Sequence, residues 1–359
     1  MNILSLFDWM SCWCEALTRA GIKIDNYFAS EIDKYAIEIS KKNHPDIVHI
    51  WSVTDIKFDT WTLYDKFWPV IDRKIDLLIG GSPCQDLSTA KKDGKGLAGE
   101  KSTLFFEYVR LLNETKPNYF LLENVASMKK ADRDEITRIL WVEPVMINSA
   151  LVSAQNRKRL YWVGKWNGTK YETVEIPQPE DKGILLRDIL EDIPYKDPQW
   201  KPVDEKYLID WKIRIPEATK LGYIEPVEWD GVDMAQPKST TPRGRLMRYK
   251  SNALTTGNQF MIIWITQIPR GKNKWWIVQE WEKSPTLSTS DFPNNNKIVA
   301  TDEKQYIWRK PTPIECERLQ TLPDNYTDGV SNSQRYKMIG NGWTVDTVAH
   351  IFQHIKNEK

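Results

Sequence analysis

The sequence predicts an α/β fold, in which helices cover a mostly parallel sheet, together with a smaller loop-rich domain. Short apolar runs alternate with helix-like stretches over the first half of the chain, which is typical of parallel strands joined by crossover helices. From about residue 166 to 304 prolines recur and neither a helix nor a strand period persists. The 359 residues, 41% of them hydrophobic, suffice for both cores.

Strands are expected where apolar runs end in polar residues or glycine, at NILSLF, NYFASEI, DIVHI, DLLIGGS and NYFLLENV. Helical spacing predicts helices at about 14–20, 35–42 and 102–115, and again at IECERLQTL and TVDTVAHIFQHIKN near the C-terminus. An α/β sheet binds ligands at the carboxyl ends of its strands. We therefore expect FDWMSC, SEID, GGSPCQ and ENV at the ligand-binding edge.

Charge and cysteine usage exclude several classes of protein. The 50 basic and 49 acidic side chains leave a net charge of +1, so binding to nucleic acid would depend on local basic patches. The four cysteines form no C-x-x-C pair and the four histidines are scattered, so we expect neither a disulfide framework nor a metal site. No apolar run reaches the roughly 18 residues of a membrane span, and no signal peptide pattern is present. We expect a cytoplasmic protein.

Cys84 stands in GGSPCQDLS, directly after an expected buried strand. Gly80 and Gly81 allow an unusual backbone path and Pro83 restricts it, so the cysteine would be held rigidly at the end of the sheet. A buried free cysteine is more often a core residue than a nucleophile. The flanking Gly-Gly-Ser-Pro favours the nucleophile, because a core residue needs no such geometry.

Glu123 ends the next buried strand, in LLENV. A carboxylate there is costly unless it is paired or used in chemistry, and its alternative role is a helix cap or a salt bridge. In AQNRKRLYW, Gln155, Arg157 and Arg159 alternate, so they share one face of an extended segment. Two guanidinium groups could then converge on the acid or on an anionic substrate, although a solvated strand face would have the same pattern.

These elements, in this order, resemble the DNA cytosine-5 methyltransferase family. SPCQ resembles the nucleophile motif of that family, ENV its acid motif, QNRKR its Q-x-R-x-R motif, and IECERLQTLPDNYT and IGNGWTVDTVAHIF its last two motifs. The resemblance covers about residues 1–165 and 305–359. It implies a Rossmann-like, S-adenosylmethionine-dependent catalytic domain at 1–165, a target recognition domain at 166–304, and a segment at 305–359 that returns to the catalytic domain.

The resemblance implies methyl transfer from S-adenosyl-L-methionine to C5 of a cytosine that is flipped out of double-stranded DNA. Cys84 would add to C6, Glu123 would protonate or hydrogen-bond N3, and Arg157 and Arg159 would position the base and the acid. A water or hydroxide would remove the C5 proton. We expect a monomer in a prokaryotic or phage-infected cell, serving restriction-modification or phage self-protection.

For the cofactor, the resemblance implies Phe7 against the adenine, backbone groups from Asp8 to Ser11 at the amino acid end, and Glu31 at the ribose hydroxyls. The remaining residues expected at this pocket are Ile32, Ser52, Val53, Pro83, Leu104 and Asn341.

Two basic stretches of the loop-rich segment, PKSTTPRGRLMRYK and PRGKNK, offer contacts to phosphates and base edges, although a charged loop is more often only solvated. The length of the segment favours DNA as the substrate, because a reader of base pairs needs a sizeable module; a tRNA cytosine-C5 methyltransferase is the alternative. The candidates for DNA binding are Gln85, Ser88, Arg243, Arg245, Arg248, Lys250, Arg270 and Lys272.

Tryptophan is overrepresented: 17 residues are Trp and 17 are Gly, where average usage predicts roughly 25 glycines. Trp9, Trp13 and Trp51 stand where the family typically has glycine, which permits a positive φ or a close backbone approach. Trp141 also stands where a turn favours glycine, whereas Trp343, in GNGWTVD, matches the family. One explanation is a catalytically impaired relative that only binds DNA. The other, favoured by the intact nucleophile and acid, is that UGA codons read as glycine in the natural source have been translated as tryptophan.

Overall fold

The computed structural model describes residues 1–66, 68–82, 103–193, 197–210, 212–217, 219–228, 230–233, 246–254, 260–267 and 304–355. The chain divides into two compact units. The first comprises Met1–Glu191, Tyr249–Gln259 and Pro311–Lys359, and the second comprises Asp192–Arg248 and Phe260–Lys310. The functional domain bounds expected from the sequence stay a prediction, because these units are defined by their packing alone.

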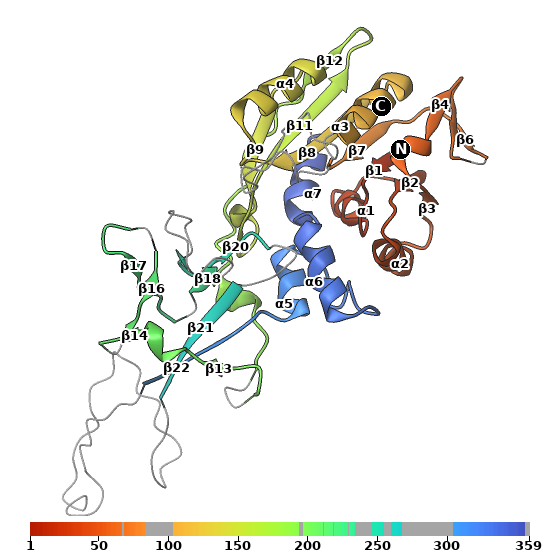
Figure 1. The fold of residues 1–359 in the computed structure, drawn as a ribbon. Coiled ribbons are helices and arrows are strands. Elements are labelled where there is room, and N and C mark those ends of the chain that lie inside the picture. Colours follow the sequence, from red (N-terminus) through yellow and green to blue (C-terminus); the bar gives the residue numbers. More distant parts are fainter. Residues whose placement is uncertain are drawn as a thin grey trace, which may run out of the picture. The chain divides into compact units, whose positions relative to one another are not determined.

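The central sheet of the first unit confirms the predicted α/β fold with a mostly parallel sheet (Figure 1). Its strands are β1 (Asn2–Leu6), β2 (Asn26–Ser30), β3 (Val48–Ile50), β7 (Leu77–Gly80), β8 (Tyr119–Val125), β9 (Pro144–Asn148), β11 (Lys158–Trp166) and β12 (Tyr171–Thr173). Their order is β12-β11-β8-β7-β1-β2-β3, with β9 also paired to β11. The strands from β3 to β8 in this order are parallel, whereas β11 is antiparallel to β8, β9 and β12.

The α-helices of the described residues all belong to the first unit. They are α1 (Cys12–Arg19), α2 (Lys34–Asn43), α3 (Thr103–Thr115), α4 (Lys130–Leu140), α5 (Pro313–Leu319), α6 (Asn332–Asn341) and α7 (Val345–Gln353). The sequence pattern did not predict α4 and α6. Both are mostly polar, and in α4 only Ile136 and Leu140 are buried, so their apolar period is weak.

Local side chains determine where several helices begin and end. Asp33 accepts hydrogen bonds from the first backbone N–H groups of α2. Thr312 and Glu315 form a capping box at the start of α5, with Pro313 at its first position. Helix α4 ends at Trp141, whose φ of 62° is left-handed, a conformation that glycine usually supplies at this position.

The core of the first unit holds the sheet edge in place. Leu4, Leu78 and Phe120, from three neighbouring strands, are fully buried, as are Phe105 and Leu111 of α3. Burying each such side chain contributes about 1.5–3 kcal/mol. Helix α7 packs beside α1 (Figure 1), with the rings of Trp13 and Phe352 6.2 Å apart. The C-terminal motif therefore lies next to the first turn of the chain.

Smaller elements complete both units. The described residues of the first unit include a three-stranded meander that the sequence pattern did not predict, a short parallel pair and three 3-10 helices: β4 (Lys57–Asp59), β5 (Thr62–Tyr64), β6 (Pro69–Asp72), β10 (Gln155–Asn156), β20 (Ser251–Asn252), η1 (Val53–Asp55), η4 (Ser149–Leu151) and η5 (Leu186–Ile189). The second contains a sheet of order β13-β22-β21-β18-β19, two hairpins and a 3-10 helix: β13 (Lys201–Pro202), β14 (Leu208–Ile209), β15 (Lys212–Ile213), β16 (Ile215–Pro216), β17 (Tyr223–Ile224), β18 (Gly231–Asp233), β19 (Leu246–Met247), β21 (Phe260–Gln267), β22 (Lys304–Arg309) and η6 (Glu205–Tyr207). None of the helices among the described residues has the length and apolar character of a membrane span.

Candidate active site

Glu123 lies at the ligand-binding edge of the sheet, near the end of β8, and is 8% exposed. Its Oε1 forms an ion pair of 2.9 Å with Nε of Arg159. Arg159 stands near the start of β11, directly opposite Val125 of β8. The antiparallel pairing of these strands thus brings together the acid and one of the two predicted arginines, which satisfies the charge of a buried carboxylate.

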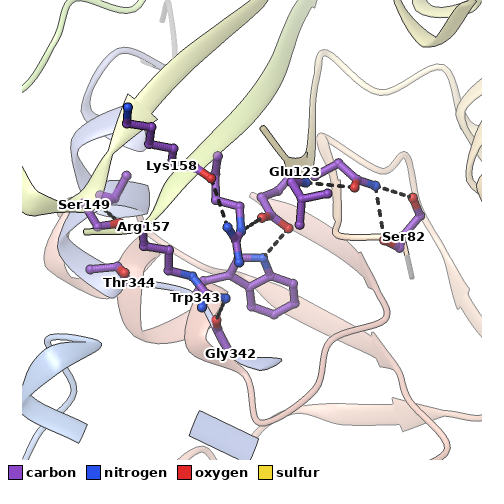
Figure 2. Close-up of polar contacts among 12 residues, drawn as sticks. Ser82, Glu123, Ser149, Arg157, Lys158, Gly342, Trp343 and Thr344 are labelled. Atoms are coloured by element: carbon purple, nitrogen blue, oxygen red, sulfur yellow. Dashed lines mark hydrogen bonds and ion pairs between the residues drawn. The ribbon is translucent and has the colours of Figure 1, made fainter. Parts of the chain in front are cut away.

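The other oxygen of Glu123 is bound by a residue that the sequence did not single out for the site. The indole Nε1 of Trp343 donates a hydrogen bond of 2.9 Å to Oε2 of Glu123 (Figure 2). Trp343 comes from the turn between α6 and α7 and is buried. Only its place in the GNGWTVD motif pointed to this edge, because no sequence spacing relates positions so far apart in the chain.

Gly81, three residues before the predicted nucleophile Cys84, lies against the same carboxylate. A Cβ on Gly81 would stand 2.9 Å from Oε2 of Glu123, so a side chain has no room there. The Asn124 side chain donates hydrogen bonds to the backbone oxygen and the hydroxyl of Ser82. The next residues, including Pro83, Cys84, Gln85 and Ser88, lie outside the described residues.

Arg157 does not converge on Glu123 with Arg159. It is buried, and its guanidinium donates hydrogen bonds to the carbonyl oxygens of Gly340 (3.3 Å) and Gly342 (2.8 Å) (Figure 2). The Arg157 side chain is buried, and it binds these backbone carbonyl oxygens at the end of α6 instead of the Glu123 carboxylate. The role predicted for Arg157 at the base therefore stays a prediction, and its observed contacts hold the turn that carries Trp343.

The described cysteines differ from a nucleophile in their surroundings. Cys12, Cys14 and Cys316 are buried. Burial raises the pKa of the Cys12 and Cys14 thiols to about 12, so neither forms the thiolate that nucleophilic attack requires near neutral pH. The choice of Cys84 as the nucleophile stays a prediction, because Cys84 lies outside the described residues.

The turn between β1 and α1 is built around Asp8. Its buried carboxylate accepts hydrogen bonds of 2.5 Å from the hydroxyls of Ser5, Ser11 and Tyr27. Burial raises the pKa of Asp8 to about 6, although these hydroxyl donors act in the opposite direction. The side chains of Asp8 and Ser11 are fully buried, and the predicted contact of their backbone groups with the cofactor stays a prediction.

The backbone of the same turn is strained. Phe7, Trp9 and Ser11 have φ values of 57°, 58° and 61°, and left-handed conformations cost residues other than glycine about 1–2 kcal/mol each. The indole of Trp9 donates to the carbonyl oxygen of Met338 at 2.7 Å. The indole N–H of Trp13 is buried and finds no acceptor among the described residues.

Glu31 follows β2, the neighbour of β1. Its Oε2 accepts the backbone N–H of Trp9 at 2.9 Å, and its Oε1 accepts those of Ile32 and Asp33. A carboxylate offers about four acceptor sites, so one stays available to a ligand hydroxyl. Among the other predicted pocket residues, Val53 belongs to the core, Phe7 and Leu104 pack partly buried against it, Ser52 caps η1, and Ile32 and Asn341 are exposed.

The family model of the C-5 cytosine-specific DNA methylases matches residues 1–357. The chain belongs to this family. The type II methyltransferase M1.ScrFI of Lactococcus lactis subsp. cremoris is 30% identical over 350 residues, which cover 93% of this chain and 74% of the relative. The orphan methyltransferase M.SPRI of Bacillus phage SPR is 26% identical and covers 99% and 97%. The structure of the Entamoeba histolytica methyltransferase EhMeth shows the same fold, with a TM-score of 0.58, 17% identity and coverage of 99% and 97%.

Family membership makes the chain a DNA cytosine-5 methyltransferase that uses S-adenosylmethionine. The residues that follow β1 and β2 at the carboxyl edge of the sheet are of types that could bind a nucleoside. Leu6 and Ser30 pair in register, so the Phe7 ring and the Glu31 carboxylate follow neighbouring strand ends, where they would hold the adenine and the ribose. No cluster of three or more His, Cys, Asp or Glu side chains suited to a metal ion occurs in the described part of the chain.

The predicted DNA contacts of this methyltransferase are largely untested. Arg243, Arg245, Arg270 and Lys272 lie outside the described residues. Arg248 forms an ion pair of 2.5 Å with the buried Asp230. The ammonium of Lys250 donates to the carbonyl oxygens of Ala150, Ser153 and Ile184. These bonds use all three of its donors, so Lys250 has none left for a phosphate.

Proposed function

We propose that the chain methylates C5 of a cytosine flipped out of double-stranded DNA, through a covalent bond between Cys84 and C6. The observation that supports this most is the surroundings of Glu123. Its carboxylate is held by Arg159 and Trp343 at the carboxyl edge of the sheet, and it lies against Gly81, three residues before Cys84 in the sequence. An acid and a nucleophile would then flank one base.

The proposed steps follow from the weak nucleophilicity of cytosine C5. The Cys84 thiolate adds to C6, and the electrons of the C5–C6 bond shift into the ring while Glu123 protonates or hydrogen-bonds N3. C5, now enamine-like, accepts the methyl group that S-adenosylmethionine supplies. A water or hydroxide removes the C5 proton, the C5–C6 double bond re-forms, and the Cys84 thiolate leaves. N3 then returns its proton to Glu123, whose negative charge Arg159 stabilises while the proton is on the base.

A base inside a stacked duplex cannot be reached in this way. Flipping costs a few kcal/mol, which contacts in the pocket offset. Phosphate and base contacts would come from the basic stretches of the second unit, with Arg243, Arg245, Arg270 and Lys272 as the candidates. Because relatives are named as type II and phage methyltransferases, we place the activity in restriction-modification or phage self-protection.

Methyl transfer tests the substrate. Labelled S-adenosylmethionine should label duplex DNA and not tRNA, and bisulfite sequencing of host DNA after expression should show the modified sites. Labelling of tRNA alone would establish the alternative substrate. Labelling of neither, with duplex binding intact, would establish an impaired DNA-binding relative.

A mechanism-based trap tests the nucleophile. A duplex with 5-fluorocytosine at the target should form a covalent complex that survives denaturation, because fluorine at C5 cannot leave as a proton does. Cys84→Ala should abolish the complex. Cys316→Ala, which removes a buried thiol of α5, is the matched control and should retain it. Trapping by Cys84→Ala would overturn the assignment.

A further inference from the structure

Trp343 holds Glu123 from the side opposite Arg159. The carboxylate receives one donor on each oxygen, the Arg159 Nε on Oε1 and the indole Nε1 on Oε2, both at 2.9 Å. An indole N–H only donates and does not titrate. It therefore keeps Oε2 an acceptor and fixes the plane of the carboxyl group, leaving the remaining lone pairs to face a substrate.

The indole is itself held in place. Gly342, which precedes Trp343, has its carbonyl oxygen bound by Arg157 at 2.8 Å and by Gln320 at 3.2 Å. The Trp343 ring also lies against the nucleophile segment, because a Cβ on Gly81 would stand 2.6 Å from its Cζ2 atom. The Trp343 ring thus contacts both Glu123 and Gly81, which stands three residues before Cys84 in the sequence.

We propose that Trp343 is a positioning residue for the methyl transfer reaction, which acts by orienting the carboxyl group of Glu123. This rests on the proposed function of Glu123 as the acid. A core tryptophan would be replaceable by phenylalanine, whereas a positioning tryptophan needs its N–H group. The chain offers a matched comparison in Trp162, a buried tryptophan of β11 whose Nε1 donates to Thr137 Oγ1 at 3.0 Å, away from Glu123.

The kinetic test compares Trp343→Phe with Trp162→Phe. Loss of a hydrogen bond to a charged group should lower kcat of Trp343→Phe about tenfold, with KM for S-adenosylmethionine unchanged. Trp162→Phe should change neither quantity. An unchanged kcat in Trp343→Phe, or equal losses in both variants, would overturn the proposal.

A spectroscopic test does not depend on turnover. The Trp343 indole N–H resonance, identified by its absence in Trp343→Phe, should move in Glu123→Gln, because that substitution removes the negative charge of its acceptor. The Trp162 indole resonance should not move. If the wild-type chain transfers no methyl group but the resonance behaves as described, the contact stands and the proposed function fails. A Trp343 resonance that Glu123→Gln leaves unchanged would refute the contact.

A second inference comes from the backbone and is independent of the first. In the described residues φ is positive at 11 residues other than glycine, and three of these are Trp. The three are Trp9 (58°), Trp61 (69°) and Trp141 (62°). A bulky side chain is an outlier in this region, whereas glycine adopts it freely.

Two of the three occupy positions with a known glycine preference. Trp61 is the second residue of the two-residue loop between β4 and β5, and Thr60 before it also has positive φ. Two such residues form a type I′ turn, whose second position favours glycine. Trp141 is the left-handed residue at the end of α4, and its indole is 78% exposed, so no packing compensates for the strain.

Other tryptophans have the opposite features. Trp162, Trp200 and Trp343 are buried, have no positive φ, and donate their indole N–H groups to Thr137, Ile193 and Glu123. We infer that positions 9, 61 and 141 are encoded by UGA codons that the natural host reads as glycine, whereas 162, 200 and 343 are encoded by UGG.

The nucleotide sequence tests this directly. UGA at 9, 61 and 141 together with UGG at 162, 200 and 343 is the expected result, and peptide mass spectrometry of the protein from its natural host should find glycine at the first three positions. UGG at any of the first three, UGA at any of the second three, or tryptophan in those peptides would overturn the inference.

Discussion

Two parts of the carboxyl edge of the sheet are built differently: the surroundings of Glu123, here called the acid edge, and the turn between β1 and α1 with the neighbouring strand ends, here called the cofactor edge. At Glu123 each carboxylate oxygen has a donor at 2.9 Å, and glycine stands at position 81, where a side chain would collide. In the turn after β1, Phe7, Trp9 and Ser11 have left-handed backbones and none of them is glycine. The acid edge depends on side-chain partners and the cofactor edge on backbone shape. Substitutions should therefore damage the two edges in different ways.

The largest effect is expected at the acid edge. Glu123→Gln removes the proton donor and should lower the single-turnover rate of methyl transfer about 10²- to 10⁴-fold, while circular dichroism shows an intact fold. Glu135→Gln changes an exposed glutamate of α4 that pairs with Arg138 and serves as the control. Equal rates in Glu123→Gln and the wild type would show that Glu123 takes no part in the reaction.

The variant Asp8→Asn tests whether the buried charge of Asp8 destabilises the folded chain. Folding raises the pKa of Asp8 from 3.8 to about 6, so the folded chain binds this proton more tightly than the unfolded chain. Its contribution to the free energy of unfolding is therefore lost as the pH rises from about 4 to about 6, by about 3 kcal/mol in total.

Asparagine stays neutral, so Asp8→Asn should gain stability relative to the wild type across that pH window and keep a constant difference above it. Thermal unfolding midpoints between about pH 4 and 7.5 measure this. Asp46→Asn, at an exposed aspartate, should follow the wild-type curve. Parallel curves for Asp8→Asn and the wild type would show that the buried carboxyl is not strained.

The cofactor edge is tested by the triple variant Trp9→Gly, Trp13→Gly, Trp51→Gly, whose positions lie in the turn after β1, in α1 and directly after β3. Of the three, Trp9 has a left-handed backbone, and relief of about 1–2 kcal/mol of strain there should tighten S-adenosylmethionine binding about tenfold by calorimetry. Trp141→Gly relieves strain at the end of α4 instead and should leave the affinity unchanged. Equal or weaker binding by the triple variant would count against glycine as the residue that this turn requires.

The smallest effect is expected at the end of α4. Trp141→Gly should raise the free energy of unfolding by about 1 kcal/mol, which corresponds to a rise of about 2 °C in Tm for a chain of this size. Trp68→Gly is a sharp control, because Trp68 is nearly as exposed but has no positive φ, so it should gain nothing. A higher Tm in both variants would point to lost surface hydrophobicity and not to backbone strain.

The sequence predicted correctly those strands and helices in which apolar residues recur with a clear spacing. Strands β1, β2, β7 and β8 lie where their apolar runs predict them, and their parallel order brings their carboxyl ends to one edge. Helix α4 was missed because only two of its residues are buried, and α6 because its buried apolar residues, Met338 and Ile339, are adjacent and show no helical spacing.

Side-chain partners were harder to predict. Alternation in QNRKR placed Arg157 and Arg159 on one face but could not show that Arg157 binds the carbonyl groups of α6 while Arg159 binds Glu123. The basic character of Lys250 suggested a phosphate contact, yet three backbone carbonyls occupy its ammonium. Partners depend on which segments pack together, and pattern along one segment does not contain that information.

The sequence by itself determined the fold class, the family and the candidate nucleophile and acid, because apolar period and motif order are local properties of the chain. Only the tertiary structure decided that Trp343 completes the surroundings of Glu123, since that contact requires α7 to pack beside the first turn. It also separated the tryptophans that pack from those that strain the backbone, because φ and burial are set by the folded chain.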